Sequence, residues 1–441
     1  MRPDGIGNVK RADMFFPIAT ENERGWAGRR VYPIVPCTFA VVSGPLVSIV
    51  YSLTRPDDAK DGSFSVAQVL RGTLCLMMFL SLFVSRRLRL LEHPIIRPLT
   101  FLAVYAVLTC MLAPYPYENI VFAMKITFSA FIFASAFHLA QSKLISEKWL
   151  IGSAWAVLLF MAIAQAVGLA TGNTVASYQS DYATAGVIDS ASVTAALILS
   201  TLPIFLRFFP YRRWSLAGIM IVLVCLFFTM QRTSLIAAAG VILLVLIHYL
   251  RLFQLRIPWS KCVLAILVLG VFAVIGARTQ AGSDLLTRMS DLDPREGSGS
   301  GRYVFWQISL NHILKRSIGT HIIGEGMGST RDMLERYFGL GIGNHNAWLD
   351  LTYAFGIFGL MTIVWAYFEL ARFANYLRSG GDSLFQGAFS AIVILFLISL
   401  GTGGFYDPGF ALTYAALGFW AGQSSYWEPF YYAGRAFYRA V

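Results

Sequence analysis

Long apolar runs, each about as long as a bilayer core is thick, dominate the sequence. A hydrocarbon core of ~30 Å requires about 20 apolar residues in a helix. Twelve runs of this kind follow one another, at 31–53, 64–84, 98–113, 120–141, 149–170, 187–209, 214–230, 233–250, 262–277, 347–370, 385–400 and 409–424. They lack the alternation of apolar and polar positions that barrel strands show, so the spanning elements are expected to be helices. The pattern predicts an all-α integral membrane protein with about twelve transmembrane helices.

The composition agrees with a membrane protein and excludes an ordinary soluble domain. Hydrophobic residues make up 56% of the 441 residues, charged residues only 13%, and the mean hydropathy is +0.61. Soluble domains carry about 25% charged residues.

The distribution of basic residues predicts the topology. Lys and Arg gather in both termini and in every second loop, whereas the short loops of the opposite side hold only Arg55, Lys60 and Arg232. By the positive-inside rule, both termini are expected in the cytoplasm. The formal net charge of +11 then reflects topology and an anionic inner leaflet, and it requires no nucleic-acid partner.

One long external loop divides the chain unevenly. We expect a cytoplasmic tail at 1–30, nine transmembrane helices within 31–277 and the external loop at 278–346. Three more transmembrane helices within 347–424 and a second cytoplasmic tail at 425–441 complete the chain. Structureless loops longer than about 15 residues are uncommon unless they are functional or disordered. Part of this loop should be helical, because an amphipathic stretch follows Gly301 and "STRDMLERYFG" (329–339) has a Ser/Thr start and a Gly end.

Three basic residues are predicted within or at the outer rim of the membrane. Arg71 lies in the second apolar run, Lys125 near the outer end of the fourth, and Arg232 in a tight outer hairpin. A charge at the centre of a spanning helix costs at least ~2.5–3.5 kcal/mol, so such residues usually face a cavity; snorkelling to the interface is the alternative. Together they indicate an outward-facing basic pocket for an anionic lipid headgroup, since the arginine fork suits phosphate oxygens.

A polar cluster, Asn344-His345-Asn346, stands directly before the tenth apolar run. A neutral imidazole with a pKa near ~6.5 can accept a proton from a hydroxyl group. Asn344 and Asn346 could orient the ring or contact sugar hydroxyls, Asp350 could set the tautomer of His345, and free N–H groups at the helix start would favour anions. A simple helix cap is the alternative interpretation. No histidine pair has the spacing of a metal site.

Four segments together resemble the O-antigen ligase and polymerase family of bacterial envelopes. They are "QRTS" (231–234), "GRYVFW" (301–306), the turn "GEGMG" (324–328) and "NHNAWLDLTYAFGIFGL" (344–360). The resemblance implies a C-type glycosyltransferase-like fold in the bacterial inner membrane, with the long loop in the periplasm. Arg232 and Arg302 match the family's hairpin and loop arginines, and His345 matches its proposed catalytic histidine.

The resemblance also implies a reaction. The donor would be a glycan on undecaprenyl diphosphate, and a hydroxyl of an acceptor glycan or of lipid A–core would attack its anomeric carbon. His345 would act as general base, while Arg232 and Arg302, with Arg71 and Lys125, would stabilise charge on the departing diphosphate. Because diphosphate is a good leaving group, neither a metal nor another cofactor is expected. A single displacement predicts inversion at the anomeric carbon.

The acceptor remains open at this stage. A polymerase would join lipid-linked repeat units of O-antigen or exopolysaccharide, and we prefer it because that group is larger and more varied. A ligase would transfer the finished chain to lipid A–core. A polytopic transporter is a third possibility, but transporters usually contain internal repeats, and the sequence shows no repeat about its midpoint.

Overall fold

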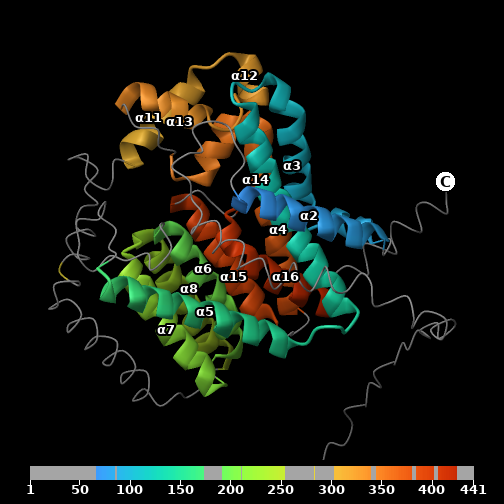
Figure 1. Ribbon diagram of the computed structural model, residues 1–441, viewed down its shortest axis with the longest axis vertical. Helices are drawn as coiled ribbons and strands as arrows, with labels where there is room; N and C mark the ends of the chain where they lie inside the picture. The colour runs from blue at the N-terminus through green and yellow to red at the C-terminus, as the bar shows by residue number, and fades with distance from the viewer. Residues whose placement is uncertain are drawn as a thin grey trace, which may run out of the picture.

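The computed structural model describes residues 66–84, 87–172, 191–209, 211–253, 283, 302–338, 344–379, 384–401 and 406–424. Within these ranges the chain is helical and contains no strand (Figure 1). The α-helices are α2 (Val66–Val84), α3 (Arg97–Leu108), α4 (Pro116–Gln141), α5 (Glu147–Ala170), α6 (Ala191–Phe208), α7 (Arg213–Thr229), α8 (Arg232–Phe253), α11 (Arg302–Leu314), α12 (Ile318–Ile323), α13 (Ser329–Phe338), α14 (Ala347–Ser379), α15 (Phe385–Gly401) and α16 (Ala411–Gln423). Short 3-10 helices complete the list: η3 (Leu88–Glu92), η4 (Thr109–Leu112) and η6 (Pro408–Phe410).

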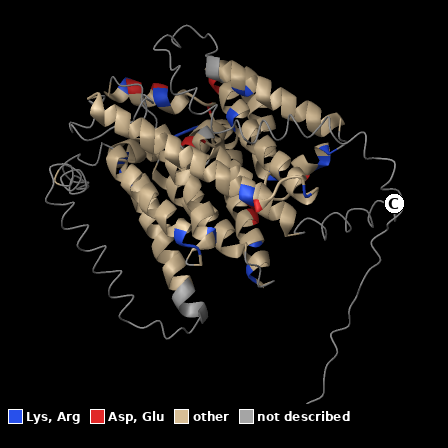
Figure 2. Ribbon diagram, turned by 60° about the horizontal axis from the view of Figure 1, so that its bottom comes forward, with Lys and Arg blue, Asp and Glu red and all other residues tan. Residues whose placement is uncertain are grey.

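Ten of the twelve predicted apolar runs correspond to helices of the structure. Their ends differ by up to five residues, except that α14 continues nine residues beyond the predicted end at 370. The remaining two, 31–53 and 262–277, lie outside the described residues, as do both predicted cytoplasmic tails. Helices α4, α5, α6 and α14 are long and apolar enough to cross a membrane, and five shorter apolar helices accompany them. The protein is therefore a membrane protein, and the number of twelve spans stays a prediction. Charged residues lie mostly near helix ends and in connections (Figure 2).

The tightest helix pair of the core is α4 with α16. Gly418 and Gly422 are one helical turn apart, and a Cβ at either would lie only 2.3 Å and 2.6 Å from the carbonyl oxygens of Phe133 and Phe137. Small residues four apart allow helices to approach closely in membranes. This contact holds α16 against α4 at the centre of the molecule, with α3 and α2 beside α4 and with α5, α6, α7, α8 and α15 forming a second group (Figure 1).

The predicted external loop contains helices where it is described. Helices α11, α12 and α13 lie together at one end of the molecule, next to the start of α14 (Figure 1). Residues 329–338 form α13, so the predicted helix is present; its predicted end at Gly339 lies outside the described residues. The hydroxyl of Ser329 donates to the carbonyl of Gly326 and therefore differs from an ordinary N-cap, which accepts from backbone N–H groups. Helix α12 was not anticipated from the sequence.

Helix α14 is broken near its beginning. Gly356 has φ 59° and ψ −146°, outside helical geometry. The backbone groups freed by the break are bonded by the "GEGMG" turn, because Glu325 N and Gly326 N donate to the carbonyls of Tyr353 and Ala354 at 3.3 and 2.7 Å. The sequence indicated a turn at 324–328, and the structure shows that this turn packs against the break. Together they hold α12 and α13 over the first two turns of α14.

Candidate functional site

The start of α8, the start of α11 and the end of α15 meet at Arg302. Its Nη1 atom donates to the carbonyl of Gly401 at 2.7 Å and to the hydroxyl of Thr233 at 3.2 Å. A hydrogen bond of 3.4 Å also joins Thr233 to the carbonyl of Gly401. The guanidinium group therefore connects three segments that are far apart in the sequence, and it places its positive charge at their junction.

Helix α11 also holds the polar cluster that precedes α14. The indole Nε1 of Trp306 donates to the carbonyl of Asn344 at 2.8 Å, and the Ser309 hydroxyl donates to its Oδ1 at 2.5 Å. Asn344 is fully buried. Its side chain thus fixes the cluster to α11 and is not available to contact a sugar in this conformation.

Asn346 is the N-cap of α14. Its Oδ1 accepts from the backbone N–H groups of Trp348 and Leu349 at 3.0 and 3.2 Å, and its Nδ2 donates to the carbonyl of Leu400 at 3.2 Å. The helix-cap interpretation is therefore correct for this residue. The cap uses two of the N–H groups that the sequence predicted to be free at the helix start. Asn346 also joins α14 to the end of α15.

His345 lies between Asn344 and Asn346, but its side chain points in another direction. It has a left-handed backbone with φ 53°, one of three non-glycine residues with positive φ in the described part of the chain. Such a conformation costs roughly 1–3 kcal/mol and persists where neighbouring contacts impose it. Asn344 and Asn346 are buried whereas His345 is exposed, so the turn directs the imidazole away from the protein core.

The protonation of His345 differs from the expectation based on an isolated imidazole. Surrounding protein atoms desolvate the partly exposed ring, and the nearby positive charge of Arg302 acts in the same direction. Together these effects lower the pKa of His345 to about 4. The ring is therefore neutral at physiological pH and can accept a proton, but it is a weaker base than a free histidine. The same electrostatic interaction shows that His345 lies near Arg302.

Asp350 faces the backbone of the polar cluster. Its carboxyl group lies near the backbone N–H groups of Asn344 and Asn346. These contacts support the turn that presents His345. On the other side, Tyr406 interacts electrostatically with Asp350 and its ring packs against Phe122 of α4 with centroids 4.9 Å apart. The site is thereby connected to the central α4–α16 pair.

Two further predicted residues lie on α2 and α4. Arg71 is fully buried in α2, and Lys125 of α4 is partly exposed. Both lie beside the contact between these helices, since a Cβ at Gly72 would be 3.6 Å from the sulfur of Met124. Lys125 is about one turn from Phe122 and thus from the ring pair with Tyr406. Full burial of Arg71 argues against snorkelling at this position.

Arg232 is the first residue of α8 and adjoins Thr233, so it lies at the edge of the Arg302 junction. Its side chain is partly exposed. The positive end of the α8 dipole adds to the charges of Arg232 and Arg302. In the part of the chain that the structure describes, no group of three or more His, Cys, Asp or Glu residues could hold a metal ion. Metal independence remains a prediction.

Comparison with known families identifies the segment that contains this junction. The family model described as O-antigen ligase matches residues 217–364. These residues form an O-antigen ligase family domain. The domain extends from α7 to the kinked part of α14 and includes Arg232, Arg302 and His345. No curated protein matches the chain.

The O-antigen ligase domain confirms the family that the four sequence segments resemble. It implies a glycosyltransferase-type ligase activity. It supports the ligase alternative better than the polymerase that we preferred from the sequence, and that preference was based only on the size of the polymerase group. The match does not extend to α4 and α15, although each supplies residues near the site.

Sequence reasoning missed the residues that hold Arg302 and Asn344 in place by hydrogen bonds. Thr233 and Trp306 stand inside the motifs "QRTS" and "GRYVFW", and their side chains bond Arg302 and Asn344. Gly401 contributes only a carbonyl and space, because a Cβ there would lie 2.4 Å from Thr233. The cluster "GTGG" (401–404) after the eleventh apolar run was the available signal. Every residue has a backbone carbonyl, so the amino-acid type does not reveal which carbonyl accepts a hydrogen bond at the site.

Proposed function

We propose that this protein is an O-antigen ligase of the bacterial inner membrane. It transfers a finished glycan from undecaprenyl diphosphate to a hydroxyl of lipid A–core on the periplasmic side. The observation that carries the proposal is the pairing of an exposed, neutral imidazole at His345 with the charge of Arg302, inside the segment that matches the O-antigen ligase family. A hydroxyl nucleophile needs a base, and a departing diphosphate needs positive charge.

The proposed step is one displacement. The acceptor oxygen forms a bond to the anomeric carbon of the donor as the bond from that carbon to the diphosphate oxygen breaks. The electron pair leaves with the undecaprenyl diphosphate, and the hydroxyl proton passes to a ring nitrogen of His345. Arg302 and Arg232 stabilise the developing negative charge, and the α8 dipole acts in the same direction. The product has inverted anomeric configuration.

The low pKa of His345 has a consequence for this step. General bases work best when their pKa is near the operating pH. A bound diphosphate brings negative charge next to the ring, which favours the protonated form and raises the pKa. Donor binding would therefore convert a weak base into a stronger one, so that proton transfer is favoured only when the donor is in place.

Purified protein incubated with a defined undecaprenyl-diphosphate glycan tests the proposal. A ligase releases undecaprenyl diphosphate and forms lipopolysaccharide only when lipid A–core is added, and turnover persists in EDTA. NMR of the new linkage should show inversion. Growth of glycan chains on the lipid carrier without lipid A–core would identify a polymerase and overturn the ligase proposal. The same preparation carrying His345→Ala serves as the inactive control.

A further inference from the structure

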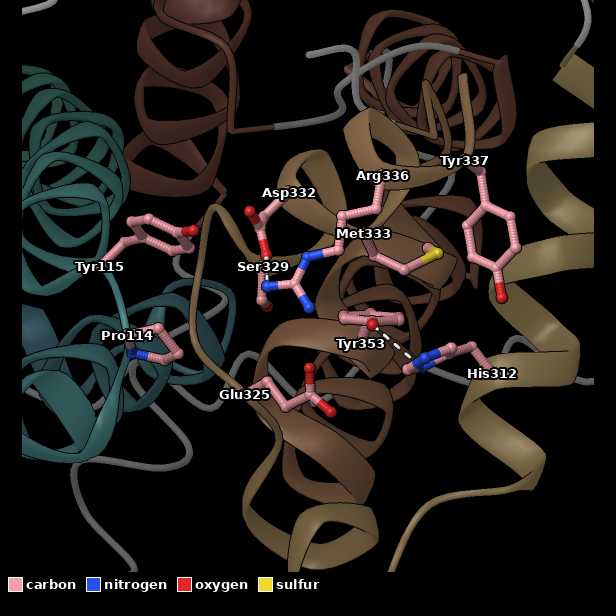
Figure 3. Close-up of a pocket in the computed structure, with 10 residues that line it drawn as sticks. All are labelled: Pro114, Tyr115, His312, Glu325, Ser329, Asp332, Met333, Arg336, Tyr337 and Tyr353. Carbon is pink, nitrogen blue, oxygen red and sulfur yellow. Dashed lines mark hydrogen bonds and ion pairs between the residues drawn. The ribbon is translucent and has the colours of Figure 1, made fainter. Parts of the chain in front are cut away.

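A cavity lies between α13 and the first part of α14. It has a volume of about 430 Å³ and is open to solvent at one side. Figure 3 shows side chains from five segments around it: Tyr115 before α4, His312 on α11, Glu325 in the turn after α12, Asp332 and Tyr337 on α13, and Tyr353 on α14. None of these residues takes part in the transfer step described above.

The charges of this cavity are paired with one another. Glu325 forms an ion pair of 2.9 Å with Arg316, and Asp332 forms one of 2.6 Å with Arg336. An anion entering the cavity would meet two carboxylates whose cations are already engaged. The cavity is therefore poorly suited to a phosphate group, in contrast to the junction at Arg302.

Aromatic groups supply the walls. Tyr115, Tyr337 and Tyr353 come from different parts of the chain. Tyr353 is held in place, because its hydroxyl is 3.1 Å from Nδ1 of His312 and the Arg316 guanidinium lies over its ring at 3.5 Å from the centroid. Tyr337 is 61% exposed. The exposed ring of Tyr337 beside carboxylate acceptors suits a ligand with both C–H faces and hydroxyl donors.

The position of the cavity fits a ligand that extends from the reacting centre. Tyr353 is eight residues beyond His345 on the first part of α14, or roughly 12 Å at 1.5 Å per residue. His312 is ten residues beyond Arg302 on α11, or roughly 15 Å. A group bound here cannot be the one that reacts at His345, but it can belong to the same extended chain.

We propose that this cavity is a binding subsite for an uncharged sugar residue of a glycan substrate, separate from the sugar that reacts. The proposal rests on the proposed glycosyl transfer. Its chemistry is that of an uncharged pyranose: hydroxyls donate to Glu325 and Asp332, and a ring face packs on Tyr337. The sugar could belong to lipid A–core or to the donor glycan, and the kinetics separate these two sources.

Tyr337→Ala removes one wall without touching a residue of the transfer site. We expect the KM for one substrate, lipid A–core or the lipid-linked glycan, to rise about tenfold while kcat stays within twofold. The substrate whose KM rises is the source of the bound sugar. Tyr337→Phe keeps the ring and should restore a KM near that of the wild type. Tyr211→Ala, at a comparably exposed tyrosine (65%) between α6 and α7, is the matched control.

Direct binding makes the test independent of turnover. Lipid-free core oligosaccharide and the phosphate-free glycan released from the donor serve as the two probes in titrations of the full-length protein in detergent. Binding of one probe should weaken about tenfold in Tyr337→Ala and in Asp332→Asn. Unchanged binding and KM in both folded variants would overturn the subsite even if the wild type is an active ligase. If the wild type shows no transfer, the titrations alone decide the subsite.

Discussion

At the scale of single residues, neighbours in the polar cluster before α14 have different roles: the two asparagines anchor the turn, and His345 presents its imidazole. The side chains of Asn344 and Asn346 form hydrogen bonds with α11, α14 and α15. His345 lies between them in a left-handed turn that directs its ring outward. The sequence showed three polar residues in a row and could not distinguish anchors from the reactive group. The hydrogen bonds make that distinction, because the side chains of Asn344 and Asn346 are bonded to neighbouring segments whereas His345 is exposed and near Arg302.

His345→Asn tests the imidazole with the least disturbance of the backbone. Asn accommodates left-handed geometry well, so the variant should melt within a few degrees of the wild type in detergent. Loss of a general base typically lowers the rate about 10²–10⁴-fold, while donor affinity should be nearly unchanged. Single-turnover rates and donor binding measure the two effects. A folded variant with wild-type turnover would show that the imidazole is not the base.

The pKa of His345 predicts an unusual pH profile. Its neutral form is the active one, so kcat/KM should fall only as the pH approaches about 4. An unperturbed histidine would already lose about tenfold at pH 5.5. We therefore expect kcat/KM to stay within about twofold between pH 5.5 and 7.5. Because kcat reports the donor complex, its acid limb should lie at higher pH. An acid limb of kcat/KM near 6.5 would contradict this assignment.

Arg302 has a structural as well as an electrostatic role. Arg302→Lys keeps the charge, but the shorter lysine side chain does not bring its ammonium group to the position of Nη1, which donates both bonds, to Thr233 and to Gly401. Each hydrogen bond from a charged group contributes roughly 1.5–3 kcal/mol, so the melting temperature and the turnover rate should both fall. Thr233→Val removes one acceptor and leaves the arginine, and a smaller loss is expected. Equal melting of wild type and Arg302→Lys would show that the bonds to Thr233 and Gly401 do not stabilise the fold.

At the scale of elements, the break in α14 positions the candidate site and the sugar cavity. The segment before Gly356 carries Asn346, Asp350 and Tyr353, and the segment after it continues to Ser379. The "GEGMG" turn fills the break so closely that a Cβ at Gly324 would lie 2.2 Å from the carbonyl oxygen of Ala354. The first segment is thus fixed under α12 and α13, where its residues can line a cavity.

Gly356→Ala should destabilise the protein for two separable reasons. Its φ of 59° is unfavourable for a side chain, and the new Cβ would lie 2.4 Å from the carbonyl oxygen of His321. Gly172→Ala is the matched control, because Gly172 has a φ of 69° with nothing within 4 Å. We expect a loss of roughly 1–2 kcal/mol at Gly172 and a clearly larger one at Gly356. Equal shifts in thermal melting in detergent would show that the break tolerates a side chain.

Sequence reasoning was most successful where apolar length alone determines the element. Ten of the predicted runs are helices because a membrane requires backbone groups to be bonded within the segment. It predicted one span at 347–370 and missed the break, since a single glycine inside an apolar run does not reveal its backbone angles. Similarly, the cluster at 344–346 marked the site, but the carbonyls of Leu400 and Gly401 that complete it have no signature in side-chain chemistry.

At the scale of the whole molecule, the second part of α14 relates the site to the membrane. From Gly356 to Ser379 it measures roughly 34 Å at 1.5 Å per residue, enough to cross a core of ~30 Å. The site and the sugar cavity lie at the beginning of this helix, and Arg372 and Arg378 lie near its end. If the positive-inside rule holds here, the site faces the periplasm.

Cysteine labelling tests this orientation. Lys315→Cys, after α11, and Ser379→Cys, at the end of α14, are introduced separately after replacement of the five native cysteines. Both positions are exposed, so access to the thiol depends on the side of the membrane and not on burial. An impermeant maleimide should label Lys315→Cys in intact spheroplasts and Ser379→Cys only after permeabilisation. The reverse pattern would place His345 and Arg302 in the cytoplasm, where a periplasmic transfer to lipid A–core could not occur.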